Sequence, residues 1–177
     1  MKRLLIFLML SAFAFSLHAQ SVKSELPKPN KQQGLKTDGI VQPYLSDFLE
    51  LCKKYDIDFH EKLFKLKEIA VVDSLQVNTK GGTLGLLVRD ENKEVEKIIF
   101  SWMTLLDKEI LKVVAFHEFG HYFLGYKHTC GDCNVIMAEV NSSYFDIVKD
   151  WESQVEKLFL ESPEYNKNKN VNYYVEN

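Results

Sequence analysis

Residues 117–128 read His-Glu-Phe-Gly-His-Tyr-Phe-Leu-Gly-Tyr-Lys-His, and the rest of the chain can be interpreted outward from them. Apolar residues upstream recur at helical spacing, which predicts a helix from Asp107 to Leu124. Residues four apart lie on the same face of a helix, so the imidazoles of His117 and His121 can both bind one zinc ion at about 2.0–2.1 Å. Glu118 then lies beside the metal without binding it, where it can accept a proton from a water molecule.

A catalytic zinc site usually has three protein ligands and one open position. His128 is the candidate for the third ligand, but on a continuous helix it would lie about 10 Å along the axis from His121. The helix must therefore end before His128. Gly125 predicts that end, because glycine enters the left-handed conformation that closes helices at little steric cost. A turn there would return His128 to the metal.

This pattern resembles the active site of the metzincin clan of zinc metallopeptidases, which reads H-E-x-x-H-x-x-G-x-x-H and is followed by a Met-turn. The resemblance covers the active-site helix, Gly125, His128 and, downstream, Ile136-Met137. The chain departs from the pattern by one extra residue between His121 and Gly125, which a longer last turn or a bulge would absorb.

The resemblance implies a zincin-like α+β fold, in which a small mixed sheet packs on an N-terminal helix and the active-site helix, followed by a Met-turn and a C-terminal helix. It also implies Zn2+ as the cofactor, with His117, His121 and His128 as ligands and Glu118 as general base. Gly125 and Met137 would form structural turns, the Met137 thioether filling an irregular gap beneath the ligands.

Two site assignments stay open. In the related gluzincin class a glutamate on a following helix is the third ligand, which makes Glu139 the alternative to His128, although Glu139 lies in the expected Met-turn region. Metzincins often have a tyrosine soon after the methionine of the Met-turn, and this tyrosine can stabilise the oxyanion. Here Tyr144 is the nearest candidate.

The N-terminus predicts export. Residues 1–19 have a basic start at Lys2 and Arg3, a short apolar run and Ala19 at a suitable cleavage position, which is typical of a secretory signal peptide. The apolar run is too short for a membrane span, so no stable membrane insertion is expected after cleavage. Residues 20–40 are polar and contain prolines, which predicts a flexible lead-in or a propeptide.

Residues 41–162 form the predicted metallopeptidase domain, and residues 163–177 a disordered tail. The 177-residue chain has 22 basic and 25 acidic residues. Without Lys2 and Arg3 the basic count is 20, and the net charge 20 − 25 is −5. That balance gives no electrostatic footprint for nucleic acid. We expect a monomer acting on peptide or protein substrates.

Hydrophobic periodicity predicts the remaining elements. A helix is expected from Pro43 to Tyr55, and another from Tyr144 to Leu160, capped by Ser142 or Ser143 and burying a stripe that begins at Phe145. Strands are expected at Leu66–Val72, Thr83–Val88 and Val95–Trp102, the last two paired antiparallel. By the metzincin resemblance, Gly82–Leu87 is the sheet edge to which an extended peptide adds as another strand.

Cys130 and Cys133 form a C-x-x-C pair in a chain that we expect to be exported, where disulfides persist. A bond between them would tighten the loop below the metal. Cys52 is the odd cysteine and is either a buried thiol or the partner of one of the other two.

These observations favour a secreted zinc metalloendopeptidase. One alternative is a non-catalytic, zinc-stabilised binding module of the same fold. The other is an endoribonuclease of the rRNA-maturation type, whose three-histidine motif ends in G-Y-x-H, as residues 125–128 do. That family is cytoplasmic and lacks a glutamate after its first histidine, so the signal peptide and Glu118 argue against it.

Overall fold

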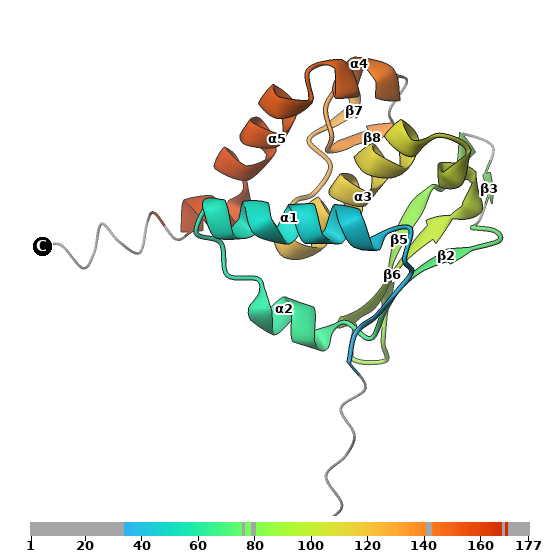
Figure 1. Ribbon diagram of the computed structural model, residues 1–177, viewed down its shortest axis with the longest axis horizontal. Coiled ribbons are helices and arrows are strands. Elements are labelled where there is room, and N and C mark those ends of the chain that lie inside the picture. The colour runs from blue at the N-terminus through green and yellow to red at the C-terminus, as the bar shows by residue number, and fades with distance from the viewer. Residues whose placement is uncertain (1–33, 76, 79–80, 141–142, 168, 170–177) are drawn as a thin grey trace, which may run out of the picture. The chain divides into compact units, whose positions relative to one another are not determined.

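The computed structural model describes residues 34–75, 77–78, 81–140, 143–167 and 169, which belong to one compact unit, Gln33–Asn177. Its architecture is mixed α+β, with helices packed on a small sheet (Figure 1). The predicted signal peptide, residues 1–19, lies outside the described residues. In the part of the chain that is described, no helix combines the length and apolar character needed to cross a membrane.

The main sheet has four strands in the order β1-β2-β6-β5. Strands β1 (Lys36–Thr37), β2 (Glu68–Val72) and β6 (Val95–Ser101) run parallel, whereas β5 (Gly85–Arg89) lies antiparallel to β6 at the edge. The expected antiparallel pairing of the last two strands is confirmed. Short ladders join β3 (Val77–Asn78) to β4 (Gly81–Gly82), and β7 (Cys130–Asp132) to β8 (Ala138–Val140).

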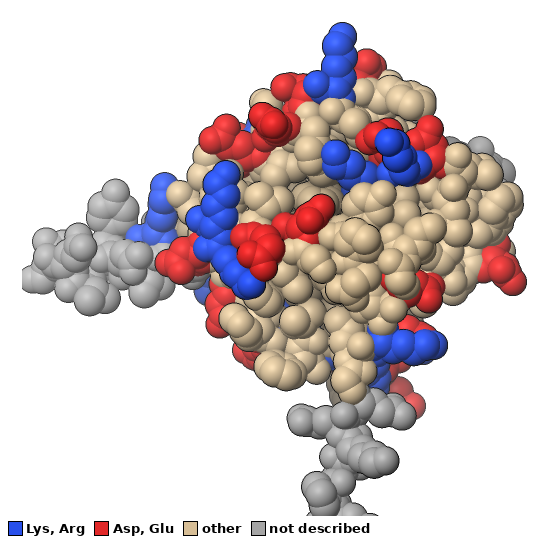
Figure 2. Space-filling model, in the orientation of Figure 1, with Lys and Arg blue, Asp and Glu red and all other residues tan. Residues whose placement is uncertain are grey.

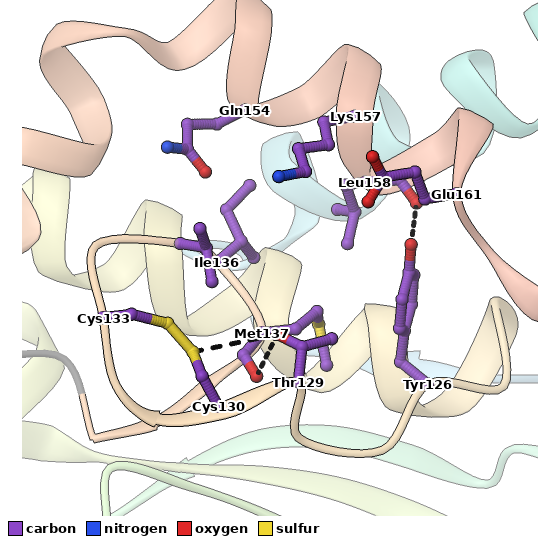
Figure 3. Close-up of a pocket in the computed structure, with 11 residues that line it drawn as sticks. Tyr126, Thr129, Cys130, Cys133, Ile136, Met137, Gln154, Lys157, Leu158 and Glu161 are labelled. Carbon is purple, nitrogen blue, oxygen red and sulfur yellow. Dashed lines mark hydrogen bonds between the residues drawn. A yellow bond between two sulfur atoms is a disulfide. The ribbon is translucent and has the colours of Figure 1, made fainter.

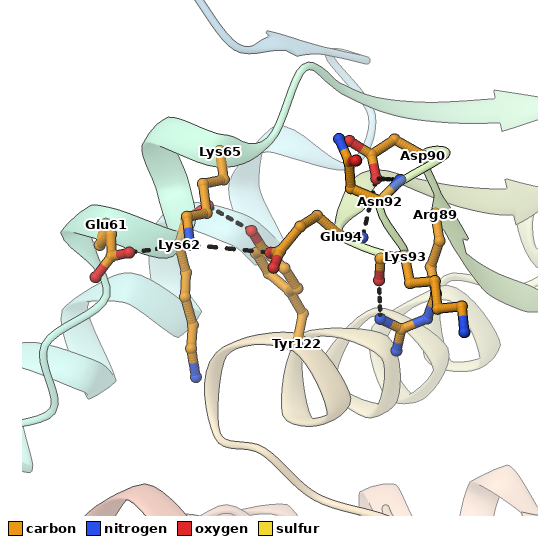
Figure 4. Close-up of polar contacts among 9 residues, drawn as sticks. All are labelled: Glu61, Lys62, Lys65, Arg89, Asp90, Asn92, Lys93, Glu94 and Tyr122. Atoms are coloured by element: carbon orange, nitrogen blue, oxygen red, sulfur yellow. Dashed lines mark hydrogen bonds and ion pairs between the residues drawn. The ribbon is translucent and has the colours of Figure 1, made fainter.

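The β5–β6 connection is a tight polar turn (Figure 4). The Asp90 carboxylate accepts hydrogen bonds from the backbone N–H groups of Asn92 and Glu94, at 2.9 and 3.0 Å. Lys93 has a positive φ of 66°, and its carbonyl oxygen accepts from the Arg89 guanidinium at 2.8 Å. The turn fixes the register of β5 against β6, and therefore the position of the sheet edge.

The helices are α1 (Gln42–Lys54), α2 (His60–Lys65), α3 (Lys108–Phe123), α4 (Tyr144–Lys149) and α5 (Trp151–Leu160), with a 3-10 turn, η1, at Trp102–Leu106. The predicted helices at Pro43–Tyr55 and Asp107–Leu124 are confirmed as α1 and α3. Helix α3 lies between the sheet and the C-terminal helices (Figure 1). It is apolar on nearly all sides, as expected of a helix with neighbours on both faces.

Phe48 of α1 lies at the centre of the core. Its ring is fully buried and packs against Phe116 and Phe119 of α3, and against Phe159 of α5, with centroid separations of 5.2, 5.4 and 5.1 Å. Phe119 also contacts Phe100 of β6 at 6.2 Å. One aromatic cluster thus joins the sheet, α1, α3 and α5, and holds α3 rigidly in place.

Charges of both signs are interspersed over the face of the molecule shown in Figure 2.

Two predictions for the C-terminal part of the chain are wrong. The predicted helix Tyr144–Leu160 is two helices, because the backbone at Asp150 leaves the helical conformation with φ −114° and ψ 37°. Phe145, predicted to be buried, is 64% exposed, and Ile147 is buried instead. Residues 145 and 148, like residues 147 and 151, are three or four positions apart, so periodicity alone does not show which pair faces the core. Packing against α3 decides it. Ser143 caps α4 as predicted, its side chain accepting from the Asp146 N–H.

Both ends of the described chain are more structured than the sequence indicates. Lys36 and Thr37, expected in the flexible lead-in, form β1 through parallel pairing with β2. Residues 163–167, expected in the disordered tail, are helical, and Glu164 binds Lys62 of α2 at 2.8 Å. Hydrogen bonds and an ion pair to distant segments order residues whose local composition predicts disorder. Residues 170–177 lie outside the described part.

Candidate metal centre

Helix α3 positions the first two histidines, and its ends follow the sequence signals. The Asp107 carboxylate accepts from the Glu109 N–H at 2.7 Å and caps the start. At the other end Gly125 has a φ of +74°, the left-handed conformation expected of a helix-closing glycine. The Gly120 carbonyl oxygen accepts from the N–H groups of both Leu124 and Tyr126, each at 3.2 Å. The extra residue is therefore accommodated in a longer last turn.

The chain turns at Gly125 and brings His128 to the other two histidines. One nitrogen from each of His117, His121 and His128 lies within 4.8 Å of the others, close enough for all three to bind one metal ion. Glu139, the alternative third ligand, is not in this group and is exposed in β8. His117 and His121 are partly buried, whereas His128 is exposed, so the group opens to solvent on the His128 side.

Two backbone carbonyl groups orient the helical pair. The Nδ1 atom of His117 lies 2.7 Å from the Ile136 oxygen, and Nδ1 of His121 lies 2.8 Å from the Tyr126 oxygen. A carbonyl oxygen only accepts hydrogen bonds, so both Nδ1 atoms carry the proton and donate it. The Nε2 atom of each neutral ring therefore presents a lone pair. Such a contact is the usual way in which metal-binding histidines are fixed.

The separation of the Nε2 atoms matches a metal site. Nε2 of His117 lies 3.0 Å from Nε2 of His121 and 3.2 Å from Nε2 of His128. Two nitrogens bound tetrahedrally to zinc at 2.0–2.1 Å are about 3.3 Å apart. Lone pairs at this separation repel one another unless a cation lies between them, so the three side chains fit a bound metal ion.

Burial keeps the imidazoles of His117 and His121 in their neutral form. Desolvation lowers the pKa of His117 to about 4, and the neighbouring His121 and His128 add to this, while the hydrogen bond to Ile136 acts in the opposite direction. Desolvation also lowers the pKa of His121. Both imidazoles are therefore neutral at neutral pH, which is the state that binds metal.

One loop, residues 126–137, carries His128 and both orienting carbonyls. Figure 3 shows residues of this loop facing Gln154, Lys157 and Leu158 of α5. The Thr129 N–H donates to the Met137 oxygen at 2.9 Å, and the Tyr126 hydroxyl donates to the Leu158 oxygen of α5 at 2.8 Å. The disulfide between Cys130 and Cys133 confirms the expected pairing, and Cys52 is a buried free thiol. The loop is thus closed on itself and attached to α5, with a pocket between them.

Met137 is 3% exposed and lies in the turn that follows Ile136. A Cβ atom placed on Gly120 would lie 2.7 Å from its sulfur, so the thioether packs against the bare side of α3 between the metal-facing residues. The burial and close packing expected of Met137 are thus observed, whereas its place beneath a bound metal ion stays a prediction.

Glu118 is the most unusual residue of the site. Its side chain is 6% exposed, and burial raises the pKa of its carboxyl group to about 8. Among the described residues no hydrogen bond or ion pair is found for this carboxyl group. It points toward the edge strand, because a Cβ on Gly85 would lie 2.4 Å from its Oε1 atom. Buried polar groups without a partner are rare and destabilising, and they are typical of functional sites.

Three residues that contribute to the site were not predicted from the sequence. Tyr126 and Ile136 act through backbone carbonyls, which every residue has, so no side-chain pattern identifies them. Gly85 had a usable signal, because a glycine inside a strand often marks a close approach of another group. Tyr144, the candidate for oxyanion stabilisation, is half-buried at the start of α4, and no contact with the three histidines is found for it among the described residues.

Comparison with known proteins gives no relative: no family model, no curated protein and no solved structure matches the chain. The function is therefore inferred from the geometry and chemistry of the residues at this centre.

Proposed function

We propose that this protein is an exported zinc metallopeptidase of zincin-like fold that hydrolyses peptide bonds. One observation carries the proposal: one nitrogen from each of three imidazoles lies within 4.8 Å of the others, and Glu118, which follows His117 on the same helix, has a buried carboxyl group for which no partner is found among the described residues. His117, His121 and His128 would hold the zinc. Burying a carboxyl group without a partner lowers stability, and a purely structural site gains nothing that would offset this cost.

The roles follow from the side chains. When bound, zinc polarises a carbonyl group and lowers the pKa of water to about 7. The Ile136 and Tyr126 carbonyls hold the rings of His117 and His121 in the metal-binding tautomer. Glu118 would accept the proton of the attacking water and pass it to the leaving amine, a contribution of typically 10²–10⁴-fold in rate.

The sheet edge supports a peptide as the substrate. Ser101 donates its N–H to the Leu84 oxygen at 2.9 Å, and hydrogen-bonded and non-hydrogen-bonded pairs alternate along an antiparallel ladder. The backbone groups of Gly85 and Leu87 therefore point away from β6. Within the described residues no strand pairs with that side of β5. An extended peptide can bind there as an added strand, beside Glu118.

The alternative, a zinc-stabilised binding module without activity, shares the three histidines but gives Glu118 no role. The experiment that separates the two combines metal analysis with a peptide-library cleavage assay on the purified chain and its Glu118→Gln variant. We expect one zinc per chain in both proteins, and chelator-sensitive cleavage only in the wild type. Equal cleavage by the variant would refute the general-base role. Bound zinc without any cleavage by the wild type would support the binding module.

A further inference from the structure

Gly85 marks the closest approach between the sheet edge and the active-site helix. A Cβ atom added to it would lie 2.4 Å from Oε1, 2.5 Å from Cγ and 2.7 Å from Cδ of Glu118. All three atoms belong to one side chain, and all three distances are shorter than carbon atoms tolerate. The carboxyl group of Glu118 therefore occupies the space that any other residue at position 85 would fill.

This relationship is not general among the glycines of the fold. An added Cβ on Gly39 or Gly131 would meet nothing within 4 Å. On Gly82, which precedes β5, it would meet only the end of the Met103 side chain, at 2.9 Å. Gly125 is the one described glycine with a positive φ, so the backbone conformation of Gly85 does not require glycine. The space taken by Glu118 is the feature that requires it.

The same residue offers its backbone to the open edge. Gly85 is opposite Phe100 in a non-hydrogen-bonded pair, as the Ser101–Leu84 bond shows, so its N–H and C=O groups point outward. A peptide added to β5 would pair with these groups. Gly85 thus contacts Glu118 on one side and lies next to the peptide-binding edge on another.

We propose that Gly85 is a positioning residue of the peptidase: its missing side chain forms the slot that holds the Glu118 carboxyl group against strand β5. This rests on the proposed function. A methyl group at position 85 would push the flexible Glu118 side chain out of the slot and would leave the histidines and the backbone edge unchanged. Binding of metal and peptide would persist while proton transfer is lost.

The test compares Gly85→Ala with Gly39→Ala, the same chemical change at an open position. Gly85→Ala is expected to bind one zinc, to keep KM within about threefold and to lose roughly 10²-fold in kcat, within the range of a lost general base. In the Glu118→Ala background the same substitution is expected to have no further effect on the residual rate. Gly39→Ala is expected to resemble the wild type.

Two outcomes would overturn the proposal: kcat of Gly85→Ala within threefold of Gly39→Ala, or an equal loss with and without Glu118. If Gly85→Ala binds no zinc, the double variant with Glu118→Ala is tested for zinc binding. Restored binding supports a clash between the new methyl group and the Glu118 side chain, and a continued lack of binding refutes the proposal. If the wild type cleaves no peptide, the proposed function fails separately. A crystal structure of Gly85→Ala then tests the slot, with a displaced Glu118 carboxyl group expected and an unmoved one contradicting it.

Discussion

The sulfur atom of Met137 lies directly against the bare side of Gly120, where a Cβ atom would be only 2.7 Å away. Gly120 immediately precedes His121, and Met137 immediately follows Ile136, whose carbonyl orients His117. The contact therefore joins the helix that carries two ligands to the turn that fixes one of them. The large side chain of Met137 fills the space that the missing side chain of Gly120 leaves open.

Met137→Ala is expected to lower the free energy of unfolding by about 3 kcal/mol, as for other large-to-small core changes. Adding Gly120→Ala should recover about 1 kcal/mol, because the new methyl group enters the vacated space and alanine favours the helix. In the wild type, Gly120→Ala would instead meet the sulfur and would not stabilise. Urea unfolding of the four proteins measures this cycle, and strictly additive changes would contradict the contact.

The identity of the third ligand gives a second prediction. His128→Ala should weaken zinc binding by more than about 100-fold, since even loss of an outer contact to a ligand costs 10–100-fold. The matched control is Glu139→Ala, because Glu139 is exposed in β8 and is not among the clustered ligand atoms. Competition with a chromophoric chelator measures both affinities. Loss of zinc in Glu139→Ala and not in His128→Ala would reverse the assignment.

The disulfide between Cys130 and Cys133 gives a third prediction. Cys130 and Cys133 lie in the loop that carries His128 and the Ile136 carbonyl. Replacing both by serine should lower stability by about 2 kcal/mol, the loop-closure estimate for so short a ring. We expect zinc affinity to fall about tenfold as well, because the orienting carbonyl becomes less fixed. An unchanged affinity, measured by the same chelator competition, would show that the hydrogen bonds alone hold the loop.

Cys52 predicts how stability depends on pH. Its thiol is fully buried, and desolvation raises its pKa from 9.0 to about 12. Between these values the thiol ionises in the unfolded chain but not in the folded one, so stability present below pH 9 is lost as pH rises toward 12. From pH 8 to pH 10.5 the loss is about 2 kcal/mol for this group.

Urea unfolding of the wild type and of Cys52→Ala at both pH values isolates that contribution. The alanine variant should be less stable at pH 8, because a small cavity remains, but its stability should fall less by pH 10.5. A native thiol that reacts with a disulfide reagent at pH 8 as fast as the urea-unfolded chain would contradict the buried, un-ionised state.

The clustering of the three histidines was predictable because the signals for it are local. The i, i+4 spacing of His117 and His121 and the glycine at position 125 each act within a few residues, and the structure places them as expected. The strands β5 and β6 and the helices α1 and α3 follow from periodicity for the same reason.

Features that depend on packing between distant segments were not predictable. The break at Asp150 and the choice of Ile147 over Phe145 depend on the surface that α3 presents. The order of residues 163–167 depends on Lys62, which binds both the Phe123 carbonyl and Glu164, at 3.0 and 2.8 Å. The slot opposite Gly85 likewise depends on how β5 meets α3.

The three clustered histidines and the two carbonyl groups that orient them come from residues 117–137, a stretch of continuous chain, whereas the space for Glu118 comes from a strand more than thirty residues earlier. Short-range contacts form at lower entropic cost than long-range ones. A partly folded chain can therefore assemble its ion-binding half before the sheet docks. For the proposed peptidase, capture of the ion and competence for hydrolysis would then arise at different stages of folding, because only the second would need the docked sheet.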